Sequence, residues 1–108
     1  METVEFLILK NLLHNEEYVR KVIPFIKSDY FEDINQKIVF EEIIKFVEEY
    51  NQPATKEVLC IETEKRQDIT DESFKEITQL ISSLEETDTE FEWLVNTTEK
   101  WCRDRAIY

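Results

Sequence analysis

The chain of 108 residues contains no glycine. At the average usage of about 7%, a chain of this length would have roughly eight. A P-loop, a dinucleotide-binding fingerprint, an EF-hand loop and a nucleophile elbow all need glycine at fixed positions. Only glycine accepts the backbone angles or the close approach that these motifs require. The sequence therefore excludes all four motifs, and its turns have to be made by other residues.

Apolar residues recur at the helical period in six segments, each preceded by a residue that favours helix N-termini. The predicted helices occupy about 3–13, 15–23, 33–51, 56–64, 70–84 and 89–108, with caps at Thr3, Asn15, Asp33, Thr55, Thr70 and Thr89. Asp33 with Gln36, and Thr89 with Glu92, resemble capping boxes. Pro24 is expected to end or bend the second helix, because proline lacks a backbone donor. No segment alternates like a strand, so we expect an all-α, compact bundle of about six helices in a single domain spanning 1–108.

The apolar content is high enough for a stable core. Hydrophobic residues make up 42% of the chain and aromatic residues 12%. The helical periodicity places one set of these side chains on inward faces: Leu7, Phe31, Phe40, Ile43, Val47, Phe74, Ile77, Leu94 and Trp101. We expect this set to form the core.

The charge is strongly negative, with 13 Lys and Arg against 25 Asp and Glu, a net charge of -12. From Asp68 to Glu92 there are nine acidic residues and one lysine, a net charge of -8. Such a chain should repel DNA phosphates and anionic lipid, so we expect no direct nucleic-acid binding and no membrane contact. A basic or neutral protein is the partner that this charge favours. The adjacent glutamate pairs are interpreted as a solvated surface, with a small enzyme that uses clustered carboxylates as the less favoured alternative.

The residues used for nucleophilic catalysis and metal binding are scarce. The single histidine, His14, is expected to bind the last carbonyls of the first helix. Cys60 and Cys102 are far apart and in apolar settings, which indicates reduced, buried thiols in a cytoplasmic protein. We therefore predict no catalytic, cofactor-binding or metal-binding residue in this chain.

The last predicted helix, 89–108, carries the candidates for a protein interface. Trp93 falls on a flanking face of that helix, where it is either an interface anchor or a side chain partly covered by another helix of the domain. A short basic stretch follows. Its cations could pair with an acidic surface on a neighbouring subunit or simply be solvated at the helix end. The candidate interface consists of Trp93, Lys100, Arg103, Arg105 and Tyr108.

Four short motifs occur in a familiar order. They are Ser28-Asp29-Tyr30-Phe31, Lys37-Ile38-Val39-Phe40, Glu49-Tyr50-Asn51-Gln52-Pro53-Ala54-Thr55 and Cys102-Arg103-Asp104-Arg105-Ala106. In this order and spacing they resemble the N-terminal domain of DnaB-type replicative helicases, and most closely the domain found in T-even-type bacteriophages.

The resemblance implies a non-catalytic domain for assembly and partner docking, stacked on a RecA-like motor that unwinds duplex DNA at the replication fork. It implies ATP and Mg²⁺ for the full-length parent, a homo-hexameric ring, contacts with primase and a helicase loader, and the host cytoplasm as location. The helix from about 89 is expected to continue past Tyr108 into a hairpin or linker. Because most of that hairpin is missing, we expect the isolated chain to be a monomer or weak dimer.

One alternative depends on charge alone. A free-standing acidic helical adaptor, or a nucleic-acid mimic, would use the segment from Asp68 to Glu92 to occupy a basic site on another protein.

Overall fold

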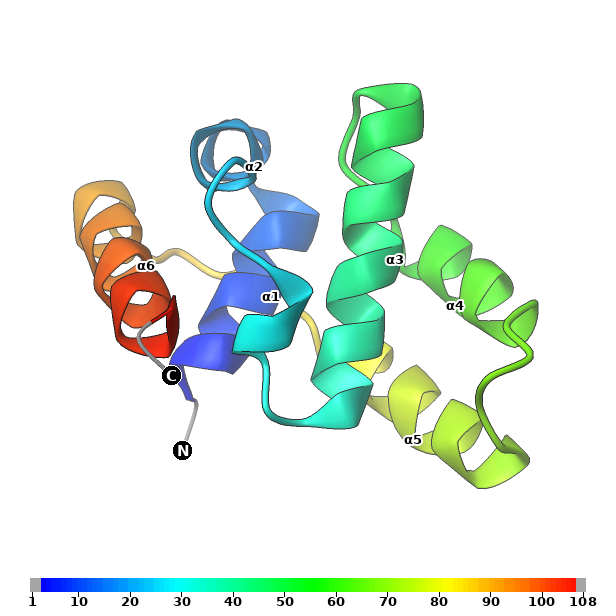
Figure 1. Ribbon diagram of the computed structural model, residues 1–108. Helices are drawn as coiled ribbons and strands as arrows, with labels where there is room; N and C mark the ends of the chain where they lie inside the picture. The colour runs from blue at the N-terminus through cyan, green and yellow to red at the C-terminus, as the bar shows by residue number, and fades with distance from the viewer. Residues whose placement is uncertain (1–2, 107–108) are drawn as a thin grey trace.

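The computed structural model describes residues 3–106 and is all-helical over that range (Figure 1). This confirms the expected all-α bundle. The elements are α1 (Val4–His14), α2 (Glu16–Val22), the short 3₁₀-helix η1 (Ser28–Tyr30), α3 (Ile34–Tyr50), α4 (Lys56–Glu64), α5 (Asp71–Ser82) and α6 (Phe91–Ala106).

Five of the six predicted capping residues cap their helices. In each case a side-chain oxygen accepts a hydrogen bond from an amide of the first turn, which would otherwise be unpaired. These residues are Thr3, Asn15, Asp33, Thr55 and Thr70. At the other end of α3, Asn51 adopts the left-handed conformation, with φ 55° and ψ 35°. Glycine usually fills this position, and asparagine is the common substitute.

The predicted cap of α6 was wrong. Glu90, not Thr89, caps this helix: its carboxylate accepts hydrogen bonds from the amides of Glu92 at 3.2 Å and Trp93 at 2.6 Å. The backbone carbonyl of Glu90 also accepts the bond from Leu94 that starts the helix. The Thr89 hydroxyl instead pairs with the hydroxyl of Thr87 at 3.3 Å. A glutamate side chain is long enough to reach amides two and three residues ahead, so it displaces the threonine.

The helix α1 lies at the centre of the bundle. It packs against α2, α3 and α6, while α4 and α5 pack on the far side of α3 (Figure 1). From Ile8 to Leu13 every side chain of α1 is buried, including Lys10 and Asn11. This explains why α1 is apolar on more than one face: neighbours cover it from several sides.

Six of the nine expected core residues are buried: Phe31, Phe40, Ile43, Ile77, Leu94 and Trp101. Val47 is half-buried and packs against this core. Leu7 and Phe74 are only half-buried and lie outside the core cluster, which corrects their expected placement. The side chains of α1 are fully buried only from Ile8 onward, and its first turns are covered in part. The first turn of α5, which carries Phe74, lies at the edge of the bundle (Figure 1).

Two polar contacts join distant parts of the chain. The Tyr18 hydroxyl pairs with Thr98 Oγ1 at 2.7 Å, and Thr98 donates to the carbonyl of Leu94, so α2 and α6 share a buried hydrogen-bonded chain. Burial raises the pKa of Tyr18 well above its ordinary value. His14 Nε2 donates to the carbonyl of Leu84 at 2.6 Å. This differs from the expected bond to the end of its own helix.

Candidate protein interface

The exposed stripe of α6 carries three of the five predicted interface residues. Trp93, Lys100 and Arg103 all face solvent, and the Trp93 side chain is 49% exposed. A helix places residues seven and ten positions apart on neighbouring parts of one face, so these three side chains form a continuous stripe. Tyr108 lies outside the described residues. About half of the Trp93 surface is thus covered within residues 3–106 and half is open to solvent, so its place in an interface stays a prediction.

The stripe is less basic than its lysine and arginine suggest. Exposed acids alternate with these cations along the same helix, at Glu92, Glu99 and Asp104. Three carboxylates therefore accompany Lys100 and Arg103, neither of which forms an ion pair with another residue between 3 and 106. Of the three cations in the predicted basic stretch, Lys100 and Arg103 are exposed, whereas Arg105 turns into the domain.

Arg105 is held by the start of the chain. Its Nη2 donates to Glu5 Oε2 of α1 at 2.7 Å, and its Nη1 bonds Glu32 in the loop after η1. The guanidinium also lies 5.6 Å from the centre of the Trp101 ring, a distance at which a cation is attracted to the aromatic face. The guanidinium thus fastens the last turns of α6 to α1 and is already paired within the domain.

Glu5 is the centre of this contact. The same Oε2 that binds Arg105 accepts a hydrogen bond from Trp101 Nε1 at 3.2 Å. Burial by itself would raise the pKa of the Glu5 carboxyl, but its hydrogen bonds to backbone and Trp101, together with the Arg105 charge, lower the pKa below its ordinary value. Glu5 is accordingly bound as a carboxylate.

An aromatic cluster lies beside this contact. Trp101 packs edge-on against Tyr30, with ring centres 6.0 Å apart, and against Phe31 at 5.0 Å. Phe31 in turn packs on Phe40 at 5.0 Å. Tyr30 and Phe31 belong to the motif at 28–31 and Phe40 to the motif at 37–40. Arg105, from the motif at 102–106, lies over the ring of Trp101. Three of the four sequence motifs thus meet at one corner of the molecule.

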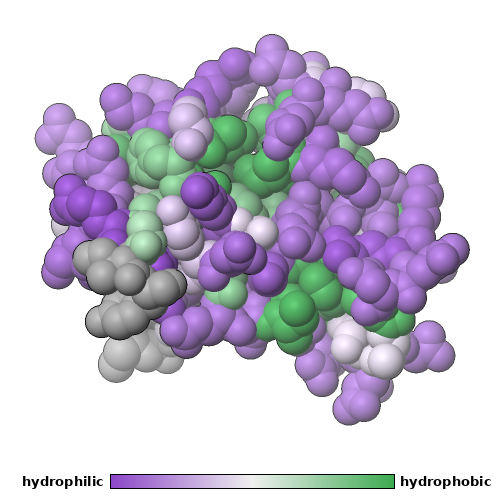
Figure 2. Space-filling model, viewed as in Figure 1, coloured by the Kyte–Doolittle hydropathy of each residue, from purple (hydrophilic) through white to green (hydrophobic). Residues whose placement is uncertain are grey.

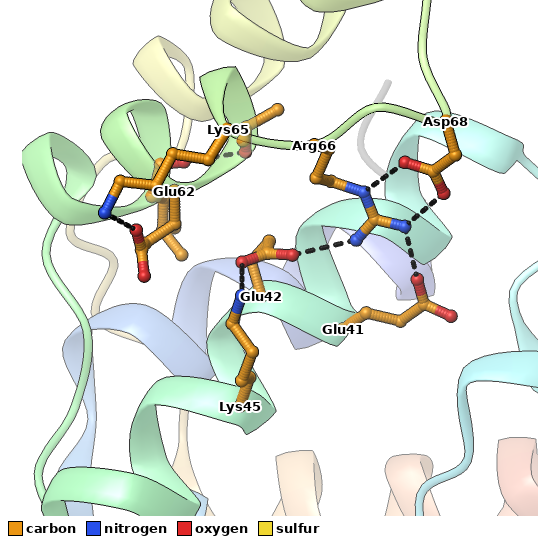
Figure 3. A network of polar contacts seen from close by, with 9 residues as sticks. Glu41, Glu42, Lys45, Glu62, Lys65, Arg66 and Asp68 are labelled. Atoms are coloured by element: carbon orange, nitrogen blue, oxygen red, sulfur yellow. Dashed lines mark hydrogen bonds and ion pairs between the residues drawn. The ribbon is translucent and has the colours of Figure 1, made fainter.

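A polar network between α3 and the loop after α4 was not predicted from the sequence (Figure 3). Arg66, in the loop after α4, donates to Glu42 Oε2 at 2.8 Å, to Glu41 at 3.2 Å and through two nitrogens to Asp68 at 2.8 and 2.9 Å. Lys45 Nζ lies 2.8 Å from the other oxygen of Glu42, whose side chain is 4% exposed. These contacts lower the pKa of Asp68 and raise that of Arg66. The network joins the 65–68 loop to α3.

Two apolar depressions flank the C-terminal half of α3. The first, about 300 Å³, lies between α2 and α3 and includes Val19, Ile23, Val47 and Pro53. Figure 2 shows hydrophobic side chains exposed between α2 and α3 and hydrophilic ones around them. Neither depression was predicted from the sequence, which assigned Val47 to the core.

The second depression, about 240 Å³, lies between α3 and α4. Its apolar residues are Phe46 and Tyr50 of α3 with Val58 and Ile61 of α4, and we call these four residues the α3–α4 patch. Tyr50 is 57% exposed and Ile61 48%. A signal was present in the sequence, since Tyr50 is the last residue of its helix and directly precedes the polar link Asn51-Gln52.

The two cysteines are free thiols; Cys102 is buried as expected, whereas Cys60 is only partly buried. Burial raises the pKa of the Cys102 thiol to about 11, and it also raises that of Cys60. No group of three His, Cys, Asp or Glu side chains between residues 3 and 106 is arranged to hold a metal ion. No helix in the same range has both the length and the apolar character needed to cross a membrane.

Comparison with known proteins confirms the resemblance that the motifs indicated: the chain is related to the DnaB-like replicative helicases. The relative is the DnaB-like replicative helicase of Enterobacteria phage T4, to which the chain is 31% identical over 102 residues. The similarity covers 94% of this chain but only 21% of the phage T4 protein, so the chain spans about a fifth of its relative. No family model matches the chain.

Proposed function

We propose that this chain is the N-terminal assembly and partner-docking domain of a phage replicative DNA helicase, and that it is not itself a catalyst. One observation carries the proposal: nearly the whole chain aligns with a DnaB-like replicative helicase while spanning about a fifth of it. A segment of that proportion is the size of one domain within a larger enzyme.

The composition supports the assignment of NTP hydrolysis to another domain of the parent protein. NTP hydrolysis by a P-loop motor needs glycines that cradle phosphate, and this chain has none. ATP and Mg²⁺ would therefore bind a separate motor domain of the full-length parent, which is the ATP-dependent helicase. With a net charge of -12, the domain itself would contribute protein contacts rather than DNA contacts.

The structure supports a docking role through its rigidity and its exposed side chains. Capped helices and a buried core give a block that holds surface residues in fixed positions, which lowers the entropy lost on binding. The proposed partners are other helicase subunits in a hexamer, the primase and a helicase loader, all in the cytoplasm of the host cell.

The test compares the longer parent protein with a version that lacks residues 1–108. We expect the shortened protein to keep NTP hydrolysis and to lose capture of the primase from the same source, measured by surface plasmon resonance. The separate 108-residue chain should capture the primase and hydrolyse no NTP. A non-catalytic role would be contradicted by a different pattern. In it, the shortened protein loses NTP hydrolysis, adding the separate chain restores the activity, and the restoration depends on one particular side chain of that chain.

A further inference from the structure

We propose that the α3–α4 patch is a docking site for a basic amphipathic helix of another protein. The patch is the part of the described surface where two of the largest exposed apolar side chains, Tyr50 and Ile61, lie beside one depression. The proposal rests on the docking role proposed above and adds the place and the chemistry of the partner.

The patch has the shape that a helix needs. The packing of α4 against α3 leaves a depression between the two helices, and the rings of Phe46 and Tyr50, whose centres lie 4.7 Å apart, form one of its walls. Val58 and Ile61 form the other wall. A helix binds such a depression by inserting apolar side chains spaced three and four residues apart.

The charges around the patch select a basic partner. Glu49 follows Phe46 by three residues on α3, and Glu57 and Glu64 lie on either side of Ile61 on α4, so each is a neighbour of a patch residue on its helix surface. All three are exposed, and no cation of residues 3–106 pairs with them. The two nearby lysines are already paired, Lys65 with Glu62 and Lys45 with Glu42, both at 2.8 Å. The rim is therefore net negative.

A second copy of this chain fits the patch poorly. Each copy has a net charge of -12, so two copies repel each other. On the α6 stripe of a second copy, Lys100 and Arg103 alternate with three exposed acids, so this surface has no net positive charge to offer. Charge complementarity thus favours a different protein that supplies lysine or arginine on both sides of an apolar stripe.

The test uses a designed helical peptide of about 18 residues, labelled with fluorescein, with leucine along one face and lysine on both flanks. We expect it to bind the 108-residue chain with an affinity that falls as salt is added, measured by fluorescence anisotropy. A matched peptide with glutamate in place of each lysine should not bind. Failure of the lysine peptide to bind at about 1 mM would overturn the proposal.

Two pairs of variants locate the site. Tyr50→Ser with Ile61→Ser should weaken peptide binding by about tenfold or more, since buried aromatic and aliphatic anchors carry most of the affinity of such contacts. Ile34→Ser with Gln79→Ser removes exposed side chains from the start of α3 and from α5, away from the patch, and should leave binding unchanged. Equal loss in both pairs, or none in the first, would show that the peptide binds elsewhere, for example between α2 and α3.

A charge-matched pair tests the rim. Replacing Glu49, Glu57 and Glu64 by glutamine should reduce both the affinity and its salt dependence. The control removes the same number of charges from α6, through Glu92→Gln, Glu99→Gln and Asp104→Asn. It should change the affinity and its salt dependence less than the rim variant does. Equal effects would mean that only the overall charge matters and would overturn the proposed site.

This proposal and the proposed function fail separately. If the patch variants alone lose peptide binding but the natural protein has no motor domain, the docking site is supported and the helicase assignment is contradicted. If the protein fails to bind the peptide, and Tyr50→Ser with Ile61→Ser leaves primase capture unchanged, the proposed function is supported and the docking site is contradicted.

Discussion

Phe40 and Phe74 occupy similar places in the sequence pattern but different places in the molecule. Phe40 is 4% exposed and packs on Phe31, whereas Phe74 is half-buried in the first turn of α5. Helical periodicity assigns both to an inward face, because it reports the direction of a side chain and not whether a neighbour covers it.

This difference gives the first prediction. Phe40→Ala should lower the free energy of unfolding by about 3–5 kcal/mol, because it leaves a cavity among packed rings. Phe74→Ala should cost about 1 kcal/mol, the typical effect of a single substitution. Urea unfolding followed by circular dichroism measures both. Equal losses would show that the first turn of α5 is better covered than the structure indicates.

The carboxyl of Glu5 gives a prediction about acid. Its pKa is lowered in the folded chain, so the unfolded chain binds more protons in the range between the two pKa values. The stabilisation it provides is fully present above its ordinary pKa and is lost as the pH falls through the lowered value. Glu5→Gln should therefore be less stable than the parent at about pH 7, with the difference shrinking toward about pH 3. A difference that stays constant across urea titrations over this range would exclude the charged contact with Arg105 as the cause.

At the scale of single helices, the sequence predicted more of the fold than of the surface. Local signals, in which an oxygen lies two or three residues from the amide it binds, correctly identified five N-caps. Arg66 could not be assigned in this way, since its partners Glu41 and Glu42 are more than 20 residues away on α3. The exposure of Tyr50 and Ile61 depends on how α4 packs, which no local pattern reports.

The helix α6 provides a direct test of the corrected cap. Glu90→Ala should destabilise the chain by about 0.5–2 kcal/mol, because the amides of Glu92 and Trp93 lose their acceptor. Thr89→Ala removes only a contact between two hydroxyl groups and should cost less. Thermal unfolding measures the stability of the two variants. A larger loss of stability for Thr89→Ala than for Glu90→Ala would support Thr89 as the N-cap of α6.

The Arg66 network is the clearest tie between two elements. Arg66→Met should cost about 1–3 kcal/mol, because it leaves the buried Glu42 with Lys45 as its remaining cation. Adding Glu42→Leu to that variant should recover part of the loss, since the buried charge is then gone. Urea titration of the single and double variants measures the recovery. A double variant less stable than Arg66→Met would show that Glu42 is stabilised mainly by Lys45.

At the scale of the whole molecule, the chain is strongly acidic, and an apolar depression lies on each side of the end of α3. The aromatic corner, in contrast, is closed: Arg105, Glu5 and Trp101 satisfy one another inside the domain. Partner contacts are therefore expected around α3, α4 and the exposed stripe of α6.

The natural length of the polypeptide decides whether this chain is one domain of a larger enzyme. Intact-mass spectrometry of the protein, isolated from its source with antibodies against the 108-residue chain, measures that length. We predict a polypeptide several times larger, whose sequence after Tyr108 contains a Gly-Lys-Thr or Gly-Lys-Ser loop. A natural product of 13.1 kDa would contradict the helicase assignment and favour a free-standing acidic adaptor.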